Sequence, residues 1–450
     1  MEEKDIFKII KNHPSAKVKV AITDIDGILR GKVMARDKFL AALDGGFGFC
    51  DVVFGWDSAD VAYDNGKFTG WHSGYPDSMA HLDPNTFRQI PWENDLPFML
   101  GDLWNADGTP ADVCPRNLLN KVRTECIEMG FAPYFSQEFE WFNFEQTPQE
   151  WADKKYRDPK PLTPGMFGYS LLRASLKHEY FNDLFDLMGK FRVPLEGLHT
   201  ETGPGVYEAA ILYDDIIESA DRAVLFKSGA KEIAYRHGIM ASFMAKQTKE
   251  LPGCSGHVHQ SLWDGSENAF FDASQPHNMS ELFQSYLAGQ LHCLPHILPM
   301  FAPTINSYKR LVEGAWAPTT LTWAQDNRTV ALRVLSAGAK SCRLETRVPG
   351  SDSNPYLALA ACLAAGLYGI KNQMTLSQPE TVGNGYLDKS NGVLPTNLWE
   401  ATQAMKKSEV ARELFGEGFV DHFTRTREWE WRQFMEQVTG WEMERYFEII

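Results

Sequence analysis

The chain has 450 residues, of which 44% are hydrophobic, and a formal net charge of −15; this composition excludes global disorder and a generally basic, nucleic-acid-binding surface. Its acidic start has no apolar signal region, and no apolar run is long enough to cross a bilayer, so we expect no membrane partner. Seven cysteines are scattered and never form a CxxC pair, which indicates reduced thiols and a cytoplasmic location.

The first hundred residues predict a small module that is rich in strands. Residues 18–25 alternate as in a strand, and Asp26-Gly27 is a typical hairpin turn before a second strand at 29–33. Residues 76–97 are rich in Pro, Asn and Asp and indicate a loop. A further strand, 98–103, is expected to complete the module.

A helix at 115–130 opens the rest of the chain, with Pro115 at its first position and Gly130 just past its end. We therefore expect two domains, 1–108 and 109–450. Further helices are predicted at 218–237, 279–293 and 354–370, and 397–450 is expected to be largely helical.

Two predicted strands of the second domain carry ionisable side chains on one face. Glu138 and Glu140 flank one apolar residue, and His257 and His259 flank another. Residues i and i+2 of a strand point to the same face, so the opposite face can be buried. Because charges are rarely buried unless paired or bound to metal, we infer one strand-lined cavity that binds divalent metal and an anionic ligand.

Two further stretches extend this cavity. Residues 199–208 predict a hairpin that brings Glu201 and Glu208 together across a Gly/Pro turn, and Glu345 shares a strand face with Arg343 and Arg347. Clustered carboxylates repel one another unless a cation neutralises them. Five carboxylates with one imidazole, that of His257, suit Mg²⁺ or Mn²⁺. The alternative is that each pair lies on an exposed strand face.

A basic block lies in residues 310–347, where six cations outnumber three anions and give a local charge of +3. Such a block in an acidic chain indicates an anionic ligand, and metal with arginines is typical of phosphoryl transfer. Neither a P-loop nor a Rossmann glycine motif is present. The alternative is a solvated network of ion pairs. The six cations are Arg310, Arg328, Arg333, Lys340, Arg343 and Arg347.

These motifs together resemble the glutamine synthetase superfamily over nearly the whole chain. The resemblance implies an α+β fold, with a small amino-terminal β-grasp-like domain and a larger catalytic domain whose curved antiparallel sheet is flanked by helices. It rests on the paired glutamates 138 and 140, the acidic pair 201 and 208, the glycine-rich histidine motif 253–261, and the segments 306–311, 327–333, 340–347, 353–358 and 441–446.

The resemblance also implies roles for single residues, which we list by ligand. One divalent ion would be held by Glu140, Glu201 and Glu208, and another by Glu138, His257 and Glu345. ATP would contact Tyr213, His259, Ser261, Lys340 and Arg343. Glutamate or its phosphorylated form would be held by Gly253, Arg310, Arg328 and Arg347, and phosphate by Arg333.

The family resemblance further implies a homo-oligomer, a dodecamer of two hexameric rings with active sites between subunits. Asp57 matches an acidic residue that a neighbouring subunit supplies to the ammonium pocket. Trp316 stands where glutamine synthetases carry the loop glutamate that closes the site and helps deprotonate ammonium. Other departures are Val206, Pro252 and the sequence at 57–60. The pattern resembles the γ-glutamylamide branch, because an indole favours an amine with an apolar or cationic body over NH₄⁺.

The resulting hypothesis is an ATP-dependent ligase that joins the γ-carboxylate of glutamate to a substituted primary amine (alkylamine, polyamine or ethanolamine type) through γ-glutamyl phosphate. One alternative is a glutamine synthetase that uses ammonia, with Trp316 as a variant loop residue. Another is a catalytically inactive structural or regulatory relative. A relative that phosphorylates guanidino groups is a further alternative.

Overall fold

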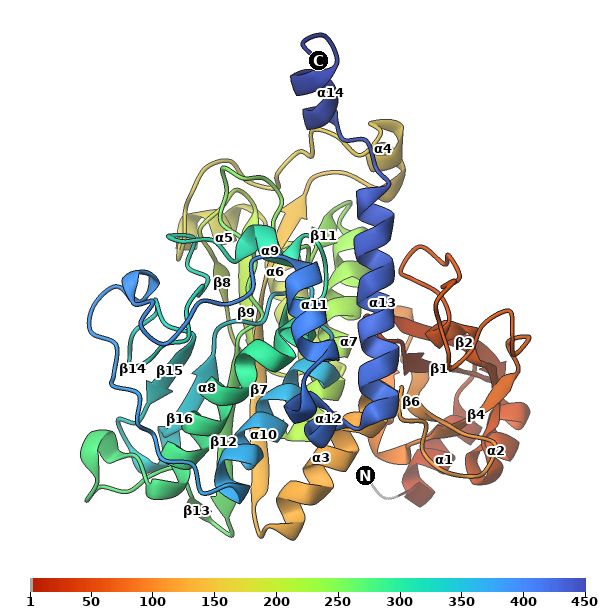
Figure 1. Ribbon diagram of the computed structural model, residues 1–450. Helices are drawn as coiled ribbons and strands as arrows, with labels where there is room; N and C mark the ends of the chain where they lie inside the picture. The colour runs from red at the N-terminus through yellow and green to blue at the C-terminus, as the bar shows by residue number, and fades with distance from the viewer. Residues whose placement is uncertain (1–2) are drawn as a thin grey trace.

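The computed structural model describes residues 3–450 and contains two separate β-sheets. The smaller sheet (red and orange in Figure 1) lies on one side of the long helix α13 (Glu417–Met435), and the larger sheet lies on the other side. Strands of the smaller sheet come from residues 17–104, and those of the larger sheet come from residues 132–346.

The smaller sheet has the strand order β2-β1-β6-β4-β3, with β5 paired to β6. The pair β1–β2 is antiparallel, whereas β1 and β6 run parallel. Its elements are α1 (Glu3–Asn12), β1 (Lys17–Thr23), β2 (Leu29–Ala35), α2 (Arg36–Gly45), β3 (Phe47–Cys50), β4 (Asp77–Leu82), β5 (Arg88–Ile90) and β6 (Leu96–Trp104).

The predicted hairpin and the strand at 98–103 are confirmed, but the prediction of a loop over 76–97 is wrong. β4 and β5 both lie in this stretch, and β4 pairs with β3 and β6. Ala80 and Leu82 of β4 are buried in the core. Pairing with distant strands therefore outweighs the turn-forming composition, which acts only locally.

The larger sheet has the strand order β14-β15-β16-β12-β7-β9-β8, with β10 and β11 paired to β7 and β13 paired to β12. Among these pairs only β14–β15 is parallel. Its strands are β7 (Ala132–Phe144), β8 (Leu195–Thr200), β9 (Val206–Ile211), β10 (Asp214–Asp215), β11 (Met240–Ser242), β12 (Val258–Asp264), β13 (Glu267–Asn268), β14 (Trp323–Gln325), β15 (Leu332–Leu335) and β16 (Arg343–Thr346).

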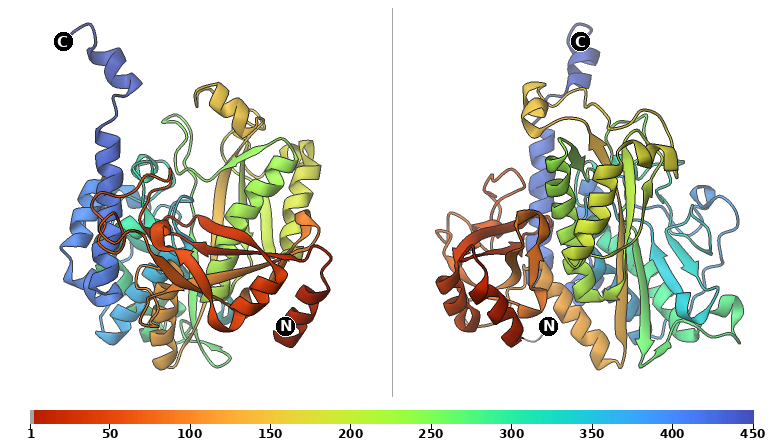
Figure 2. Two further views of the ribbon diagram at one scale, coloured as in Figure 1. Left: turned by 90° about the vertical axis from the view of Figure 1, so that its right-hand side faces the viewer. Right: turned by 180° about the vertical axis from the view of Figure 1, so that it is seen from behind.

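Burial alternates strictly along the first nine residues of β7. Phe139 is fully buried and stacks on Phe226 of α7 (Ile216–Arg236). Helices α3 (Pro115–Glu128), α7 and α10 (Pro355–Lys371) contact this side of the sheet, and Figure 2 shows α7 alongside it. The opposite face carries Glu138 and Glu140, as the alternation predicts.

The predicted helices are confirmed, and α8 (Glu281–Phe301) is longer than expected. It continues to Phe301 although Pro295 and Pro299 lie inside it. α8 packs so closely on α10 that a Cβ on Gly289 would lie 2.4 Å from the carbonyl oxygen of Ala365. This packing buries most of α8 and outweighs the loss of two backbone donors.

The helices of the second part of the chain, together with short 3₁₀ helices at 51–54, 84–86, 91–93, 276–278, 339–341 and 385–387, complete the structure. They are α3 (Pro115–Glu128), α4 (Pro148–Asp153), α5 (Leu171–Leu176), α6 (His178–Lys190), α7, α8 (Glu281–Phe301), α9 (Ser307–Arg310), α10 (Pro355–Lys371), α11 (Leu398–Lys406), α12 (Glu409–Phe415), α13 and α14 (Gly440–Tyr446).

The α+β fold class is thus confirmed, while the domain boundary at 108/109 and the β-grasp character of the first unit stay predictions. The seven cysteines are all free. Within residues 3–450, no helix combines the length and the apolar character that crossing a membrane requires.

Candidate active site

Four strands of the larger sheet place the candidate metal ligands next to one another. Glu140 of β7 lies opposite Glu208 of β9, and His259 of β12 lies opposite Glu345 of β16. β12 also pairs with β7, where His259 faces Ser136. The strand order β16-β12-β7-β9-β8 therefore brings the ionisable side chains of these neighbouring strands together on one face of the sheet.

The first group contains Glu138, His257, His259 and Glu345. His257 Nδ1 lies 2.9 Å from Glu138 Oε1 and 3.4 Å from Glu345 Oε1. His259 Nε2 lies 3.4 Å from Glu138 Oε2. Ligand atoms of Glu138, His259 and Glu345 all lie within 4.8 Å of one another. Both histidines thus contact the carboxylates, although only His257 was expected to bind metal.

Electrostatics keep the two carboxylates of this first group ionised. Burial would raise the pKa of Glu345, but Arg347 and the two histidines lower it to about 2. Burial would likewise raise the pKa of Glu138, and His259 and His257 hold it well below its usual range. Burial and Arg347 lower the pKa of His257, which favours the neutral imidazole that a metal ion requires.

The second group contains Glu140, Glu201, Glu208 and His199. Glu201 follows the last residue of β8, and its backbone N–H donates to the carbonyl of Val206 across the turn. Ligand atoms of His199, Glu201 and Glu208 lie within 4.8 Å of one another. The predicted meeting of Glu201 and Glu208 is therefore confirmed.

The second group has the chemistry of a cation site. Burial together with the charges of Glu138, Glu140 and Glu201 raises the pKa of Glu208 to about 10. A divalent cation would keep all of these carboxylates ionised at neutral pH. His257 Nε2, in the first group, is buried without a hydrogen-bond partner among the described residues, so the donor set fits divalent ions there as well.

Two buried arginines converge on Glu345. Arg333 Nη1 donates to Oε2 at 2.8 Å, and Arg347 Nη1 donates to Oε1. Arg333 also donates to Asp326. These two guanidinium groups therefore stand directly behind the first group of ligands, where an anionic substrate needs positive charge.

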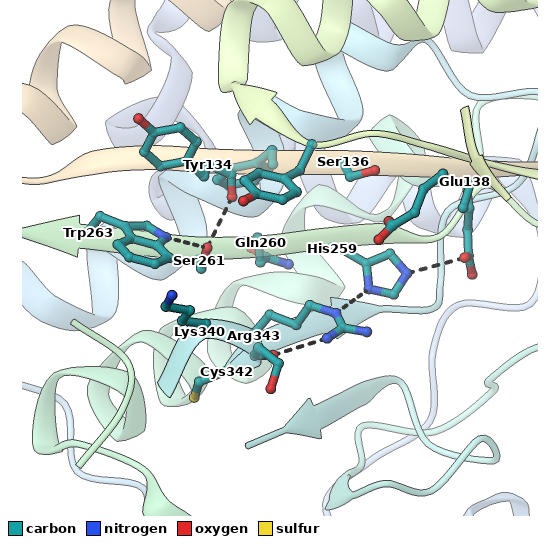
Figure 3. A pocket seen from close by; sticks show the side chains of 15 residues that line it. Tyr134, Ser136, Glu138, His259, Gln260, Ser261, Trp263, Lys340, Cys342 and Arg343 are labelled. Carbon is teal, nitrogen blue, oxygen red and sulfur yellow. Dashed lines mark hydrogen bonds and ion pairs between the residues drawn. The ribbon is translucent and has the colours of Figure 1, made fainter. Parts of the chain in front are cut away.

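A cavity of about 410 Å³ opens beside the first group (Figure 3). Arg343 Nε lies 3.2 Å from His259 Nδ1, and Trp263 Nε1 donates to Ser261 Oγ at 3.0 Å. Glu138 lies at one end of the cavity. All five residues expected to contact ATP line this cavity, namely Tyr213, His259, Ser261, Lys340 and Arg343.

Arg310 and Gly253 lie against each other. The Arg310 side chain is buried, and its Nη1 and Nη2 donate to the carbonyls of Val348 and Arg347 at 2.9 and 3.1 Å. A Cβ on Gly253 would lie 2.7 Å from Arg310 Cγ and 2.6 Å from the carbonyl oxygen of Ala245. Only glycine therefore leaves room for the arginine stem.

Trp316 and Arg328 line a second, open groove of about 600 Å³ formed with residues 324–329 and 380–383. Both side chains are exposed, and Trp316 has a left-handed backbone with φ of 57°. Burial and the charges of Glu201, Glu208 and Glu138 raise the pKa of Tyr169, and Arg328 opposes that shift.

Asp57 contacts neither group. Its Oδ1 accepts from the backbone N–H groups of Ala59 and Val61 at 2.9 and 3.0 Å, and its Oδ2 accepts from Trp429 Nε1 of α13 at 2.9 Å. Within a single chain, the Asp57 carboxylate therefore holds the loop at residues 57–61 against α13.

Sequence reasoning missed two residues near the site. His199 lies in the second group, and its i, i+2 spacing to Glu201 on a predicted strand was the available signal. The phenol of Tyr386 is buried, which raises its pKa, and Arg347, the backbone of Trp316 and Arg310 oppose that shift. No local pattern marks Tyr386, because its neighbours come from distant segments.

Comparison with known proteins gives consistent results. Residues 112–446 match the family model described as the catalytic domain of glutamine synthetase. The chain is 55% identical to type-1 glutamine synthetase 2 of Dictyostelium discoideum, over 99% of this chain and 86% of that protein. It is 37% identical to a glutamate–isopropylamine ligase of Pseudomonas sp., over 100% and 99% of the two chains. The solved ADP complex of GmaS superposes with a TM-score of 0.85 at 27% identity, over 98% of this chain and 99% of that one.

Proposed function

The chain belongs to the glutamine synthetase family and is an ATP-dependent carbon–nitrogen ligase, and from that premise we propose that it joins glutamate to a substituted primary amine. The observation that carries this proposal is the loop 311–319. Its only carboxylate, Glu313, is ion-paired with Lys389 Nζ at 2.7 Å. The loop therefore presents the Trp316 indole to the groove and no free carboxylate.

The carboxylates at the rim of this groove are also engaged. Asp326 accepts from Arg333, and Glu380 accepts from the backbone of Gln325 and lies 3.3 Å from His277 Nε2. Val382 is almost fully exposed there. An exposed indole and an exposed valine beside occupied carboxylates suit the carbon body of an amine better than they suit NH₄⁺.

The reaction proceeds in two displacements. A γ-carboxylate oxygen of glutamate attacks the γ-phosphorus of ATP, the bond to the bridging oxygen breaks, and ADP leaves. The neutral amine nitrogen then attacks the carbonyl carbon of γ-glutamyl phosphate, inorganic phosphate leaves and the nitrogen loses a proton. The protein contributes mainly positioning and electrostatic stabilisation of the transferring phosphoryl group.

We assign the residues as follows. Arg333 and Arg347 stabilise the phosphoryl group, and Arg310, Gly253 and Arg328 hold glutamate. ATP occupies the 410 Å³ cavity, with Arg343, Lys340 and Tyr213 at its wall. Mg²⁺ or Mn²⁺ ions, when bound by the two carboxylate groups, would offset phosphate charge and polarise its oxygens.

A second candidate is a glutamine synthetase that uses ammonia. The identity of 55% to a protein named as a glutamine synthetase favours it, whereas the relative named as an isopropylamine ligase is 37% identical. The convergence of the ligand groups argues against an inactive relative, since crowded buried carboxylates are costly without a cation to hold.

A coupled assay of ADP release tests these candidates. Glutamate and ATP are supplied with ammonia, ethylamine, isopropylamine, ethanolamine or putrescine, and mass spectrometry identifies the γ-glutamyl product. We expect a higher kcat/KM for an amine with two or more carbons than for ammonia, and EDTA should abolish turnover. A preference for ammonia across the panel would make glutamine synthetase the better description.

We also propose that the enzyme works as a homo-oligomer, with Asp57 serving a neighbouring subunit. Its position in the first unit, away from both ligand groups of its own chain, supports action between subunits. Mixing two inactive variants, Asp57→Ala and Glu345→Gln, under conditions that exchange subunits should restore activity. Unrestored activity after proven exchange would remove Asp57 from the site.

A further inference from the structure

His199 lies directly among the carboxylates of the second group. It is opposite Glu208 in the β8–β9 pair and two residues before Glu201. Its Nε2 lies 3.5 Å from Glu201 Oε2 and 3.8 Å from Glu208 Oε1. These separations are too long for good hydrogen bonds, and they suit three atoms around one cation.

The ring of His199 is held in this orientation. Tyr169 stacks on it, with 4.4 Å between ring centroids and 9° between ring planes. The backbone N–H of Tyr169 donates to the carbonyl of Thr200 at 2.6 Å, and the N–H of Ser170 donates to Thr200 Oγ1 at 2.8 Å. The covering segment is thus attached to β8, and the free edge of the imidazole faces the carboxylates.

Two atoms that face each other here lack partners. His199 Nε2 and Glu201 Oε2 are both buried and make no hydrogen bond among the described residues. Buried polar atoms are nearly always paired, so a shared group that satisfies both atoms is expected. A cation between them is such a group, because a neutral imidazole nitrogen and a carboxylate oxygen both offer lone pairs.

We infer that His199 Nε2 is a ligand of the divalent cation held by Glu201 and Glu208. The second position then has one nitrogen beside its carboxylate oxygens. Imidazole favours Mn²⁺ and Co²⁺ relative to Mg²⁺, which prefers oxygen ligands and retained water. His199 would therefore set the metal preference of this position. The inference rests on the divalent-cation requirement in the proposed function.

Metal binding without nucleotide or turnover tests the inference. The full-length protein is stripped with EDTA and titrated with Mn²⁺, Co²⁺ and Mg²⁺, and Mn²⁺ coupling to ¹⁵N-labelled histidine is measured by pulsed electron paramagnetic resonance. We compare wild type with His199→Ala and His199→Gln. His237→Gln is the matched control, because it removes a histidine paired with a carboxylate, Asp183, outside both groups.

Both His199 variants should weaken Mn²⁺ and Co²⁺ binding at one position by at least about tenfold and should lose one imidazole coupling. Mg²⁺ binding should change less, and the control should match wild type. Unchanged affinities and couplings in variants that fold normally by circular dichroism would overturn the inference and leave the metal requirement intact. Absence of Mn²⁺ binding to wild type would instead overturn the proposed metal requirement, and the inference with it.

Discussion

Arg333 and Glu345 lie opposite each other on β15 and β16, and Arg333 Nη1 donates to Glu345 Oε2 at 2.8 Å. The Glu345 side chain is 1% exposed, and its other oxygen accepts from Arg347. One carboxylate therefore pairs with two buried guanidinium groups and also faces His257 and His259. Glu345 therefore stabilises the fold through these ion pairs, in addition to its proposed role in metal binding.

Glu345→Ala should abolish activity and also destabilise the fold. Removing the carboxylate leaves buried positive charge without its partner, and breaking such a pair costs about 3–5 kcal/mol. Urea unfolding at one fixed protein concentration measures this loss, with Glu345→Gln as the variant that keeps the side-chain volume. An alanine variant as stable as wild type would show that solvent or a neighbouring acid replaces the lost pairing.

Gly253→Ala should raise the KM for glutamate, because the added methyl group displaces the Arg310 side chain. The new methyl group would meet Arg310 Cγ and the carbonyl of Ala245, so the arginine must move. Gly189→Ala is the matched control, because no atom lies within 4 Å of its added Cβ in α6. We expect the control to be neutral or to stabilise its helix by about 0.5–1 kcal/mol. Equal glutamate kinetics in both variants would separate Gly253 from the substrate site.

Trp316→Glu should narrow the difference in kcat/KM between a substituted amine and ammonia. A carboxylate offers NH₄⁺ a charge-assisted hydrogen bond of about 1.5–3 kcal/mol, whereas the indole returns about 0.8 kcal/mol for each methylene it buries. Trp316→Phe keeps an apolar ring at the same left-handed backbone position and should retain the amine preference. A glutamate variant with the wild-type preference would show that the indole only packs the loop.

Stability should fall as pH drops from about 6.5 to about 4, in part because of His422. Burial, and then Arg427, lowers its pKa to about 4 in the folded protein. Between these values the unfolded chain binds a proton that the folded chain does not, so the free energy of unfolding decreases as the pH falls. Above pH 6.5 His422 is neutral in both states and this loss is absent. The full loss, reached below about pH 4, is roughly 3 kcal/mol, since one pKa unit corresponds to about 1.4 kcal/mol.

His422→Phe should flatten this part of the stability profile, because a phenyl ring can occupy the site between Phe54 and Phe68 without titrating. The exposed His72→Gln is the control and should keep the wild-type slope. Chemical denaturation across this pH range provides the measurement. A slope unaffected by removal of His422 would assign the acid sensitivity to other groups.

The candidate site was predictable to the extent that its signal is local. Glu138 and Glu140 on β7 and His259 on β12 alternate with buried residues, and this alternation by itself predicts that the two glutamates share a face. The Gly/Pro turn predicts that Glu201 meets Glu208, as observed. The i, i+2 spacing of His199 to Glu201 predicts a shared face as well, but only the folded hairpin shows that its Nε2 lies near both carboxylates.

By itself the sequence determined which residues alternate, where the longer helices lie to within about two residues of their starts, and which ionisable groups share a strand face, since these properties depend on neighbours a few residues apart. Only the tertiary structure decided that residues 76–97 form strands, that α8 continues past two prolines, and that Asp57 is held by Trp429. Those outcomes depend on distant partners, whose packing and hydrogen bonds outweigh local preference.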